Sequence, residues 1–136
     1  MTPEALAAIL RESRTVAVVG LSPKPYRASN SVAAYLQEAG YRIVPVNPGH
    51  DRLLGERSYP SLTAAAAEHR IDIVDVFRRS ELAGAVVDEA LPLHPRLIWL
   101  QLGVRDDAAA ARAEAAGIPI VMDRCLAVDH QRLEAR

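Results

Sequence analysis

Five short apolar runs alternate along the chain with stretches whose apolar residues recur every three or four positions. The runs show no polar alternation, which is typical of parallel strands that are buried on both faces of a sheet. They span residues 15–20, 41–46, 71–77, 97–102 and 118–122. Pro45 and Pro119 each remove a donor from the ladder, and they favour a strand end or a sheet edge at their positions.

The stretches between the runs carry helix start and stop signals. Four residues, Thr2, Ser61, Ser80 and Asp106, have the type and the position of N-caps. Gly40 and Gly117 are placed to end two of the helices. The predicted helices cover residues 3–13, 29–39, 62–68, 81–91, 107–116 and 126–133.

This alternation predicts an α/β fold with a doubly wound, Rossmann-like sheet of five parallel strands. Right-handed crossovers make 3-2-1-4-5 the expected strand order. The length of 136 residues predicts one domain. We expect an N-terminal helix in residues 1–14, the α/β core in residues 15–123, and a short helix and tail in residues 124–136.

Composition narrows the function classes. A net charge of −1 argues against nucleic-acid binding driven by positive charge. No apolar run approaches the ~18 residues of a membrane helix, and the start lacks the basic region of a signal peptide, so we expect a cytoplasmic protein. One cysteine, Cys125, argues against a disulfide framework. The four histidines, His50, His69, His94 and His130, are not spaced as metal ligands, so the sequence predicts no metal site.

The first strand ends in a segment suited to an anion. In doubly wound sheets the ligand crevice lies beyond the carboxyl ends of the strands. Gly20 lets backbone N–H groups approach a ligand, and the next helix offers its N-terminus. Residues 13–37 contain no Asp or Glu but carry Arg14, Lys24 and Arg27, which favours a phosphate. A proline-rich surface loop with a helix cap is the structural alternative.

Nucleotide-binding signatures of other families match poorly. The NAD fingerprint needs three glycines and an acid at the end of the second strand. Here the loop has one glycine, and Asn47 stands at the acid's position. No Gly-Lys-Ser/Thr sequence is present for a P-loop. These departures weigh against a small NAD(P)-dependent oxidoreductase, which we keep as an alternative.

Five segments taken together resemble the stand-alone CoA-binding domain family, whose relatives include the N-terminal domain of the succinyl-CoA synthetase α-subunit. The resemblance covers about residues 13–130 and implies a Rossmann-like domain that binds coenzyme A at the strand ends. The segments are Val-Val-Gly-Leu-Ser (18–22) with Arg27, Ser29 and Asn30, Gly-Tyr-Arg-Ile-Val-Pro-Val-Asn-Pro (40–48), Asp-Ile-Val-Asp-Val-Phe-Arg (72–78), Trp-Leu-Gln-Leu-Gly-Val (99–104) and Asp-Arg-Cys (123–125).

The resemblance implies a role for each matching residue. The pyrophosphate site would be formed by Gly20, Leu21, Ser22, Arg27, Ser29, Asn30 and Ser31. Asn47 and Pro48 would border the adenosine. Phe77 and Arg78 would flank the adenine or the pantetheine arm, and Gln101 would face the pantetheine amides. Candidates for the 3′-phosphate are Arg52, Arg57 and Arg78.

The synthetase's ligase activity is not implied, because its phosphorylated histidine lies in a second domain outside the resemblance, and no histidine of this sequence matches that motif. The sequence therefore predicts a non-catalytic or regulatory protein that binds CoA or an acyl-CoA, with no catalytic residue identified. An accessory subunit that supplies a CoA domain to a ligase-like partner is a further alternative. Self-association is also compatible with the sequence.

Two other residues carry separate expectations. Asp75 lies inside a buried run and is expected to meet a backbone donor or an arginine, and three-residue spacing puts it and Asp72 on opposite faces of a strand. Cys125 is interpreted as a small buried hydrophobe. A mixed disulfide between this thiol and CoA is the alternative, because Arg124 adjoins it.

Overall fold

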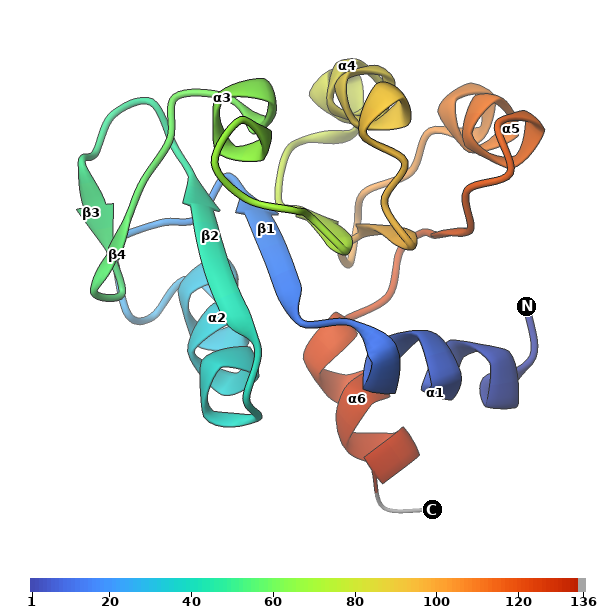
Figure 1. Cartoon of the computed structure of the whole chain (residues 1–136), viewed down its shortest axis with the longest axis horizontal. Helices are drawn as coiled ribbons and strands as arrows, with labels where there is room; N and C mark the ends of the chain where they lie inside the picture. Colours follow the sequence, from blue (N-terminus) through green and yellow to red (C-terminus); the bar gives the residue numbers. More distant parts are fainter. Residues whose placement is uncertain (135–136) are drawn as a thin grey trace.

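The computed structural model describes residues 1–134 and contains a parallel sheet, a small hairpin and six α-helices (Figure 1). The strands are β1 (Thr15–Val19), β2 (Arg42–Val46), β3 (Arg52–Leu53), β4 (Glu56–Arg57), β5 (Ile73–Val76), β6 (Leu97–Leu100) and β7 (Ile120–Val121). The helices are α1 (Pro3–Glu12), α2 (Ala28–Glu38), α3 (Leu62–Ala66), α4 (Ser80–Ala90), the 3-10 turn η1 (Leu91–Leu93), α5 (Asp107–Ala115) and α6 (Leu126–Glu134).

The sheet has the order β2-β1-β5-β6-β7, and all its pairs are parallel. The predicted class, a Rossmann-like α/β domain with five parallel strands, is confirmed. The predicted order 3-2-1-4-5 is wrong, because the third long strand, β5, pairs with β1 instead of β2. After β2 the chain forms the β3–β4 hairpin and then crosses back over the sheet through α3, so β2 becomes an edge strand.

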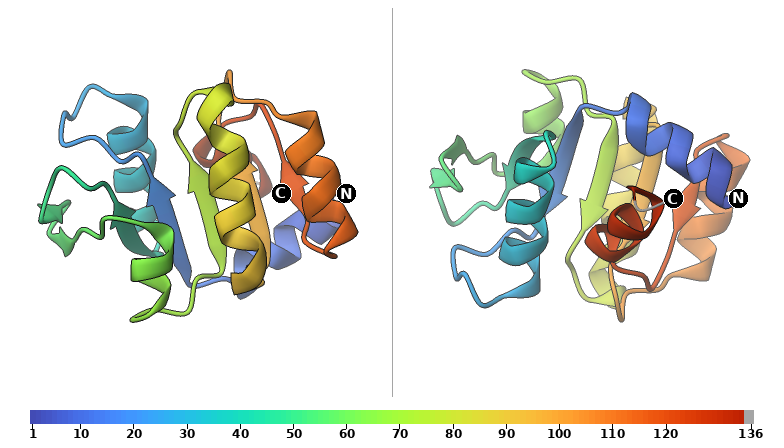
Figure 2. Two further views of the ribbon diagram at one scale, coloured as in Figure 1. Left: turned by 90° about the horizontal axis from the view of Figure 1, so that it is seen from above. Right: turned by 90° about the horizontal axis from the view of Figure 1, so that it is seen from below.

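Helices cover both faces of the sheet. Figures 1 and 2 show α3, α4 and α5 on one face, and α1, α2 and α6 on the other. Right-handed crossovers place α2 opposite to α3, α4 and α5, because β1 to β2 runs one way across the sheet and the later crossovers run the other way. The change of direction makes the boundary between β1 and β5 the topological switch point.

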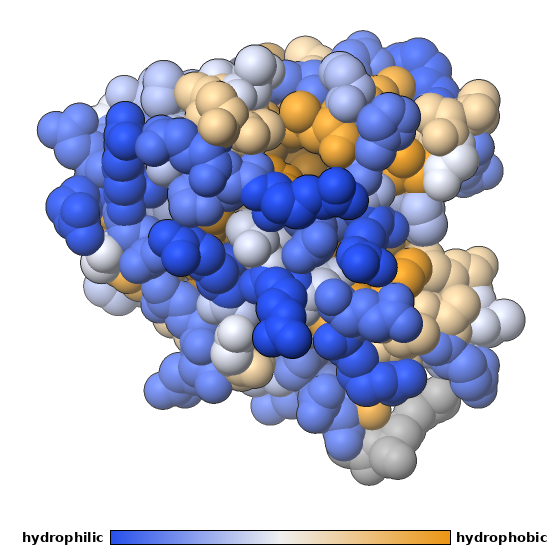
Figure 3. Space-filling model, in the orientation of Figure 1, coloured by the Kyte–Doolittle hydropathy of each residue, from blue (hydrophilic) through white to orange (hydrophobic). Residues whose placement is uncertain are grey.

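The core has two layers that the sheet separates. One cluster lies against α3, α4 and α5, and the other against α1, α2 and α6. The strands β5 and β6 are buried along their whole length, as expected for runs without polar alternation. Hydrophilic side chains cover most of the face seen in Figure 3, and hydrophobic ones show in a recess near its top and at its right. Within residues 1–134, no helix has the length and apolarity that a membrane crossing requires.

Three of the four predicted caps form. Side-chain oxygens of Thr2, Ser61 and Asp106 accept hydrogen bonds from backbone N–H groups in the first turns of α1, α3 and α5. Ser80 does not cap α4, because this helix starts at Ser80 itself. Its hydroxyl instead accepts from the Arg105 N–H at 3.0 Å, which ties the starts of α4 and α5 together.

Asp75 departs from its expected environment. Its side chain is fully buried, and neither carboxylate oxygen has a hydrogen-bond partner among the described residues. Its neighbours in the sheet are Val18 on β1 and Trp99 on β6. Burial raises the pKa of Asp75 well above its usual value.

Candidate functional site

Gly20 brings the loops after β1 and β5 into direct contact. It has a φ of +90°, and its N–H donates to Val46 O at 2.9 Å. A Cβ at this position would lie 2.3 Å from the carbonyl oxygen of Phe77. Both the left-handed conformation and this approach require glycine. Figure 2 shows the two loops leaving the same end of the strands, toward α2 and α4.

A cavity of about 330 Å³ opens at this switch point. It lies between the start of α2 and the end of β5, where doubly wound sheets bind their ligands. Its lining is Gly20, Ser22, Lys24, Arg27, Ala28, Ser29 and Phe77. The prediction named five of these as site residues. It used Lys24 only as local charge and missed Ala28, which offers little beyond its backbone as a signal.

Three polar side chains hold the backbone of the β1–α2 loop. Ser29 Oγ accepts from the Ser22 N–H at 2.9 Å, and Asn30 Nδ2 donates to Ser22 O at 2.9 Å. From the other side, Asn47 Nδ2 donates to Leu21 O at 2.8 Å. These groups are therefore engaged in fixing the loop. The Ser29 hydroxyl keeps its own proton to donate.

The start of α2 concentrates positive charge. Arg27 is its N-cap residue, and the arginine side chain makes no capping hydrogen bond. Lys24 and Arg27 both line the cavity next to Ala28, the first residue of the helix. Partial positive charge at a helix N-terminus adds to theirs and favours an anion. Arg14 lies at the opposite end of β1 and does not contribute to this site.

The arginines proposed for the 3′-phosphate have different surroundings. Arg57 is 3.1 Å from a carboxylate oxygen of Glu68 and lies over the ring of Tyr59. Arg52 donates to a carbonyl oxygen of its own hairpin at 2.6 Å. Arg78 is half-buried just after β5, and no ion pair of its side chain is found in residues 1–134. Of the three, it lies next to the switch point and is uncommitted.

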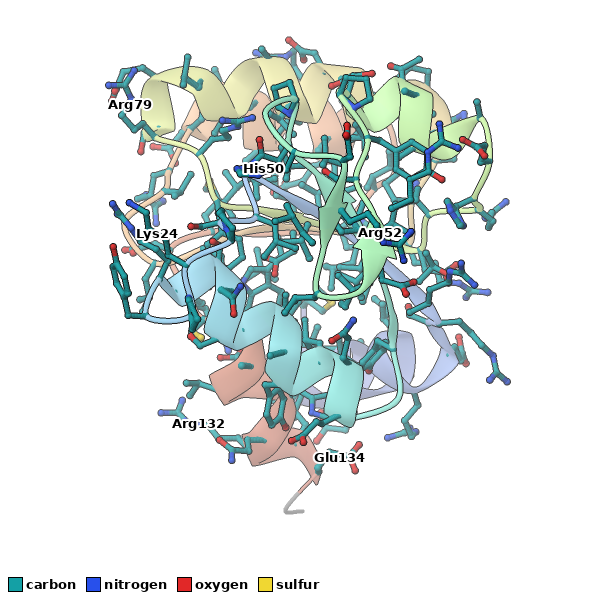
Figure 4. The ribbon with its side chains drawn as sticks, turned by 90° about the vertical axis from the view of Figure 1, so that its left-hand side faces the viewer. Lys24, His50, Arg52, Arg79, Arg132 and Glu134 are labelled. Carbon is teal, nitrogen blue, oxygen red and sulfur yellow. The ribbon has the colours of Figure 1, made fainter. Side chains whose placement is uncertain are left out.

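Figure 4 shows Lys24 and Arg79 on the side of the molecule where these loops project, and Arg132 and Glu134 lower in the view, on α6. Pro48 and Ser31 are exposed on this part of the chain. The Ser31 hydroxyl donates to a carbonyl in the first turn of α2 at 3.2 Å.

Gln101 is buried, with 4% of its surface exposed, and does not line the cavity. Its Oε1 accepts from the N–H of Leu126, the first residue of α6, at 3.1 Å. Nearby, Trp99 Nε1 donates to Arg124 O at 2.7 Å. Gln101 therefore joins β6 to the start of α6. From the sequence, its position at a strand end was equally compatible with this structural role and with ligand binding. Cys125 is half-buried and packs against the core cluster under α1, α2 and α6.

Two of the four histidines, His69 and His130, each share a hydrogen bond with a tyrosine hydroxyl and do not line the cavity. His130 Nδ1 and Tyr35 OH are 2.7 Å apart, and the His130 ring makes edge contacts with Tyr35 and Tyr41. Burial lowers the pKa of His130, against the opposing effect of Glu134, and raises the pKa of Tyr41 to about 12. His69 Nε2 lies 3.1 Å from a tyrosine hydroxyl. The described part of the chain holds no cluster of three metal-binding side chains.

Comparisons with known proteins find relatives that match nearly the whole chain. Uncharacterized protein YneT of Bacillus subtilis is 41% identical over 122 residues, which cover 90% of this chain and 89% of YneT. The structure of cell-free ID.343 from Thermus thermophilus superimposes with a TM-score of 0.92 at 41% identity, and covers 98% of this chain and 99% of its own.

A more distant match concerns the fold alone. The dinucleotide-forming acetyl-coenzyme A synthetase 1 of Ca. Korarchaeum cryptofilum has a TM-score of 0.69 at 19% identity, over 79% of this chain and 25% of its own. The sequence model of the CoA binding domain matches residues 14–131. With that match and with relatives at 41% identity over nearly the whole length, the chain belongs to the CoA-binding domain family.

Proposed function

We propose that this protein is a non-catalytic or regulatory module that binds coenzyme A, or an acyl-CoA, in the crevice at the carboxyl ends of β1 and β5. The observation that carries the proposal is the β1–α2 loop. A glycine-tight turn, an uncapped helix start and two cationic side chains, Lys24 and Arg27, converge on one cavity. Membership of the CoA-binding domain family supports CoA as the anion.

In this proposal the pyrophosphate lies on the backbone of residues 20–22 and on the first turn of α2. Lys24 and Arg27 neutralise its charge, and charge-assisted hydrogen bonds of this kind are the strong ones. Ser29 donates its free hydroxyl proton to a phosphate oxygen. Leu21 and Asn30 act through the shape of the loop that they hold, because their polar groups already bond within it.

The rest of the ligand follows the carboxyl edge of the sheet. Asn47 and Pro48 border the adenosine beside β2. Phe77 gives an apolar wall in the cavity. Arg78 receives the 3′-phosphate, because its guanidinium is uncommitted beside the switch point, and the pantetheine arm extends toward the loop after Gln101.

The alternatives receive less support. A dinucleotide oxidoreductase would need an acceptor for ribose hydroxyls after β2, and the amide of Asn47 is engaged with Leu21 and Gly49. An accessory role for a ligase-like partner, self-association and a cytoplasmic location stay predictions. A stoichiometric partner recovered with the purified protein would favour the accessory role over the stand-alone one.

Calorimetric titration with CoA, dephospho-CoA and NADH at one salt concentration tests the proposal. We expect CoA to bind, dephospho-CoA to bind more weakly, and NADH not to bind. The matched control is Arg132→Ala, which removes a cation from α6 that does not line the crevice and should leave CoA binding unchanged. Binding of NADH without CoA, or no binding of any of the three, would overturn the proposal.

A further inference from the structure

Asn47 occupies a position with a known use in dinucleotide-binding Rossmann domains. It is the first residue after β2, where those proteins carry an acid that accepts hydrogen bonds from the ribose hydroxyls. Here the side chain is half-buried, and both of its polar atoms have partners within the protein. Nδ2 donates to Leu21 O at 2.8 Å, and Oδ1 accepts from the Gly49 N–H at 2.9 Å.

These partners fix which way the amide faces. The carbonyl oxygen of Leu21 can only accept, and the N–H of Gly49 can only donate, so the nitrogen and the oxygen of Asn47 have one assignment. The backbone is held equally firmly. The Asn47 N–H donates to Tyr59 O at 2.9 Å, and Asn47 O accepts from the Ser58 hydroxyl at 3.1 Å.

We propose that Asn47 is the specificity-determining residue of the crevice, an inference that rests on the proposed function. Its amide holds the β1–α2 loop in place and keeps the end of β2 neutral, so that the site accepts a ribose that carries a phosphate in preference to one with a free diol. The ligand class selected is a 3′-phosphorylated adenosine diphosphate, with dephospho-CoA and unphosphorylated dinucleotides disfavoured.

A carboxylate at this position would have two consequences. Its oxygen would face the carbonyl oxygen of Leu21 across the present 2.8 Å contact, where two acceptors repel each other. Its charge would also repel a phosphate on the neighbouring ribose, whereas a ribose diol would gain an acceptor. The amide avoids both effects, so a single atom type separates the two ligand classes.

The test is the ratio of CoA affinity to dephospho-CoA affinity, measured by calorimetry for four proteins. Asn47→Asp should lower this ratio about tenfold, because CoA brings a 3′-phosphate to the new charge in addition to the pyrophosphate that both ligands share. Asn47→Ala removes the loop contact without adding charge, and should weaken both ligands by the same factor. Thermal melting of each variant reports whether the fold survives.

Asn30→Asp is the matched control. It makes the same substitution at the loop's other amide, which donates to Ser22 O at 2.9 Å, but on α2 instead of β2. It should weaken both ligands and leave the ratio as in the wild type.

A wild-type ratio near one, or a ratio that is equal in Asn47→Asp and wild type, would overturn the inference while CoA binding itself stands. A ratio that falls equally in Asn30→Asp would also overturn it, because the effect would then belong to added charge anywhere on the loop. If wild type binds neither ligand, the proposed function fails first. If Asn47→Asp does not fold, an Asn47→Ala variant that changes the ratio contradicts the inference.

Discussion

The loops after β1 and β6 leave the same edge of the sheet, and each contains a glycine in the left-handed region: Gly20 with φ +90° and Gly103 with φ +81°. In the β6–α5 loop, carboxylates of the protein accept from backbone N–H groups. The Gly103 N–H donates to Asp123 Oδ1 at 2.7 Å, and Asp106 Oδ1 caps α5 by accepting from the Ala109 N–H at 3.0 Å. The β1–α2 loop has no acid, and the N-cap side chain of its helix makes no capping bond.

The difference between these two loops shows how equivalent positions in one fold can serve either the stability of the protein or the binding of a ligand. Where carboxylates occupy the helix start and the loop N–H groups, the donors are used for the fold and repel an outside anion. Where the sequence omits acids and places Lys24 and Arg27 beside an uncapped helix start, no carboxylate occupies the N–H groups of the first turn of α2 and none repels an anionic ligand. The two glycines differ in the same way: a Cβ on Gly20 would strike Phe77, and a Cβ on Gly103 meets no described atom within 4 Å.

Replacing each glycine by alanine gives the largest expected effect. Gly20→Ala should abolish CoA binding and lower the free energy of unfolding by at least about 2 kcal/mol, because strain at positive φ adds to the 2.3 Å contact with Phe77 O. Gly103→Ala should cost about 1 kcal/mol from its φ alone and keep CoA affinity. Urea denaturation and calorimetry measure the two quantities. Equal loss of binding in both variants would remove the distinction between the loops.

Removing the cations is the next largest change. Lys24→Ala and Arg27→Ala should each weaken CoA binding about tenfold, and the salt dependence of binding should become shallower. Arg105→Ala is the control on the other loop, where Arg105 already pairs with Asp107 at 3.0 Å. Calorimetry at two salt concentrations checks this, and an Arg105→Ala effect as large as that of Arg27→Ala would contradict it.

Loss of the α5 cap should affect stability alone. Asp106→Ala removes the side-chain acceptor for the Ala109 N–H and should lower the free energy of unfolding by about 1 kcal/mol. CoA affinity should stay that of the wild type, because this loop takes no part in the proposed site. Chemical denaturation and a CoA titration of the same sample decide it, and weakened CoA binding would place the β6–α5 loop in the site.

The smallest expected effect is a pH dependence at His130, remote from both loops. Its pKa is lowered in the folded state by burial, so the unfolded chain binds the proton more readily. Stability should therefore fall as pH drops below about 6.5, the pKa of histidine in an unfolded chain. Urea midpoints at pH 7.5 and 5.5 measure the loss, which His130→Gln should reduce. A midpoint independent of pH in the wild type would refute the assignment.

The sequence could predict the elements and most of the layering, because buried parallel strands and capped helices leave strong local patterns. The sequence contained a signal for the strand order, the proline in the second run, but the predicted order did not take it into account. Pro45 lacks an N–H and favours an edge, yet the order 3-2-1-4-5 places its strand inside the sheet. In the structure β2 is the edge strand.

Side-chain roles at the carboxyl edge were harder to predict, because a polar residue at a strand end can serve either the fold or a ligand. Gln101 holds the start of α6, and Ser29 and Asn30 hold the β1–α2 loop. The burial of Asp75 without a hydrogen-bond partner could not be predicted either, because it depends on which residues of the neighbouring strands pack around it. The β3–β4 hairpin was missed because two-residue strands leave no periodicity.

The most direct test of the central claim is a titration of ¹⁵N-labelled protein with CoA, followed by amide chemical shifts. The account predicts that the largest shifts occur at residues 20–22 and 27–31, with those at residues 102–107 small. Shifts centred on residues 102–107, or spread away from both loops, would contradict the assignment of the crevice to the β1–α2 loop.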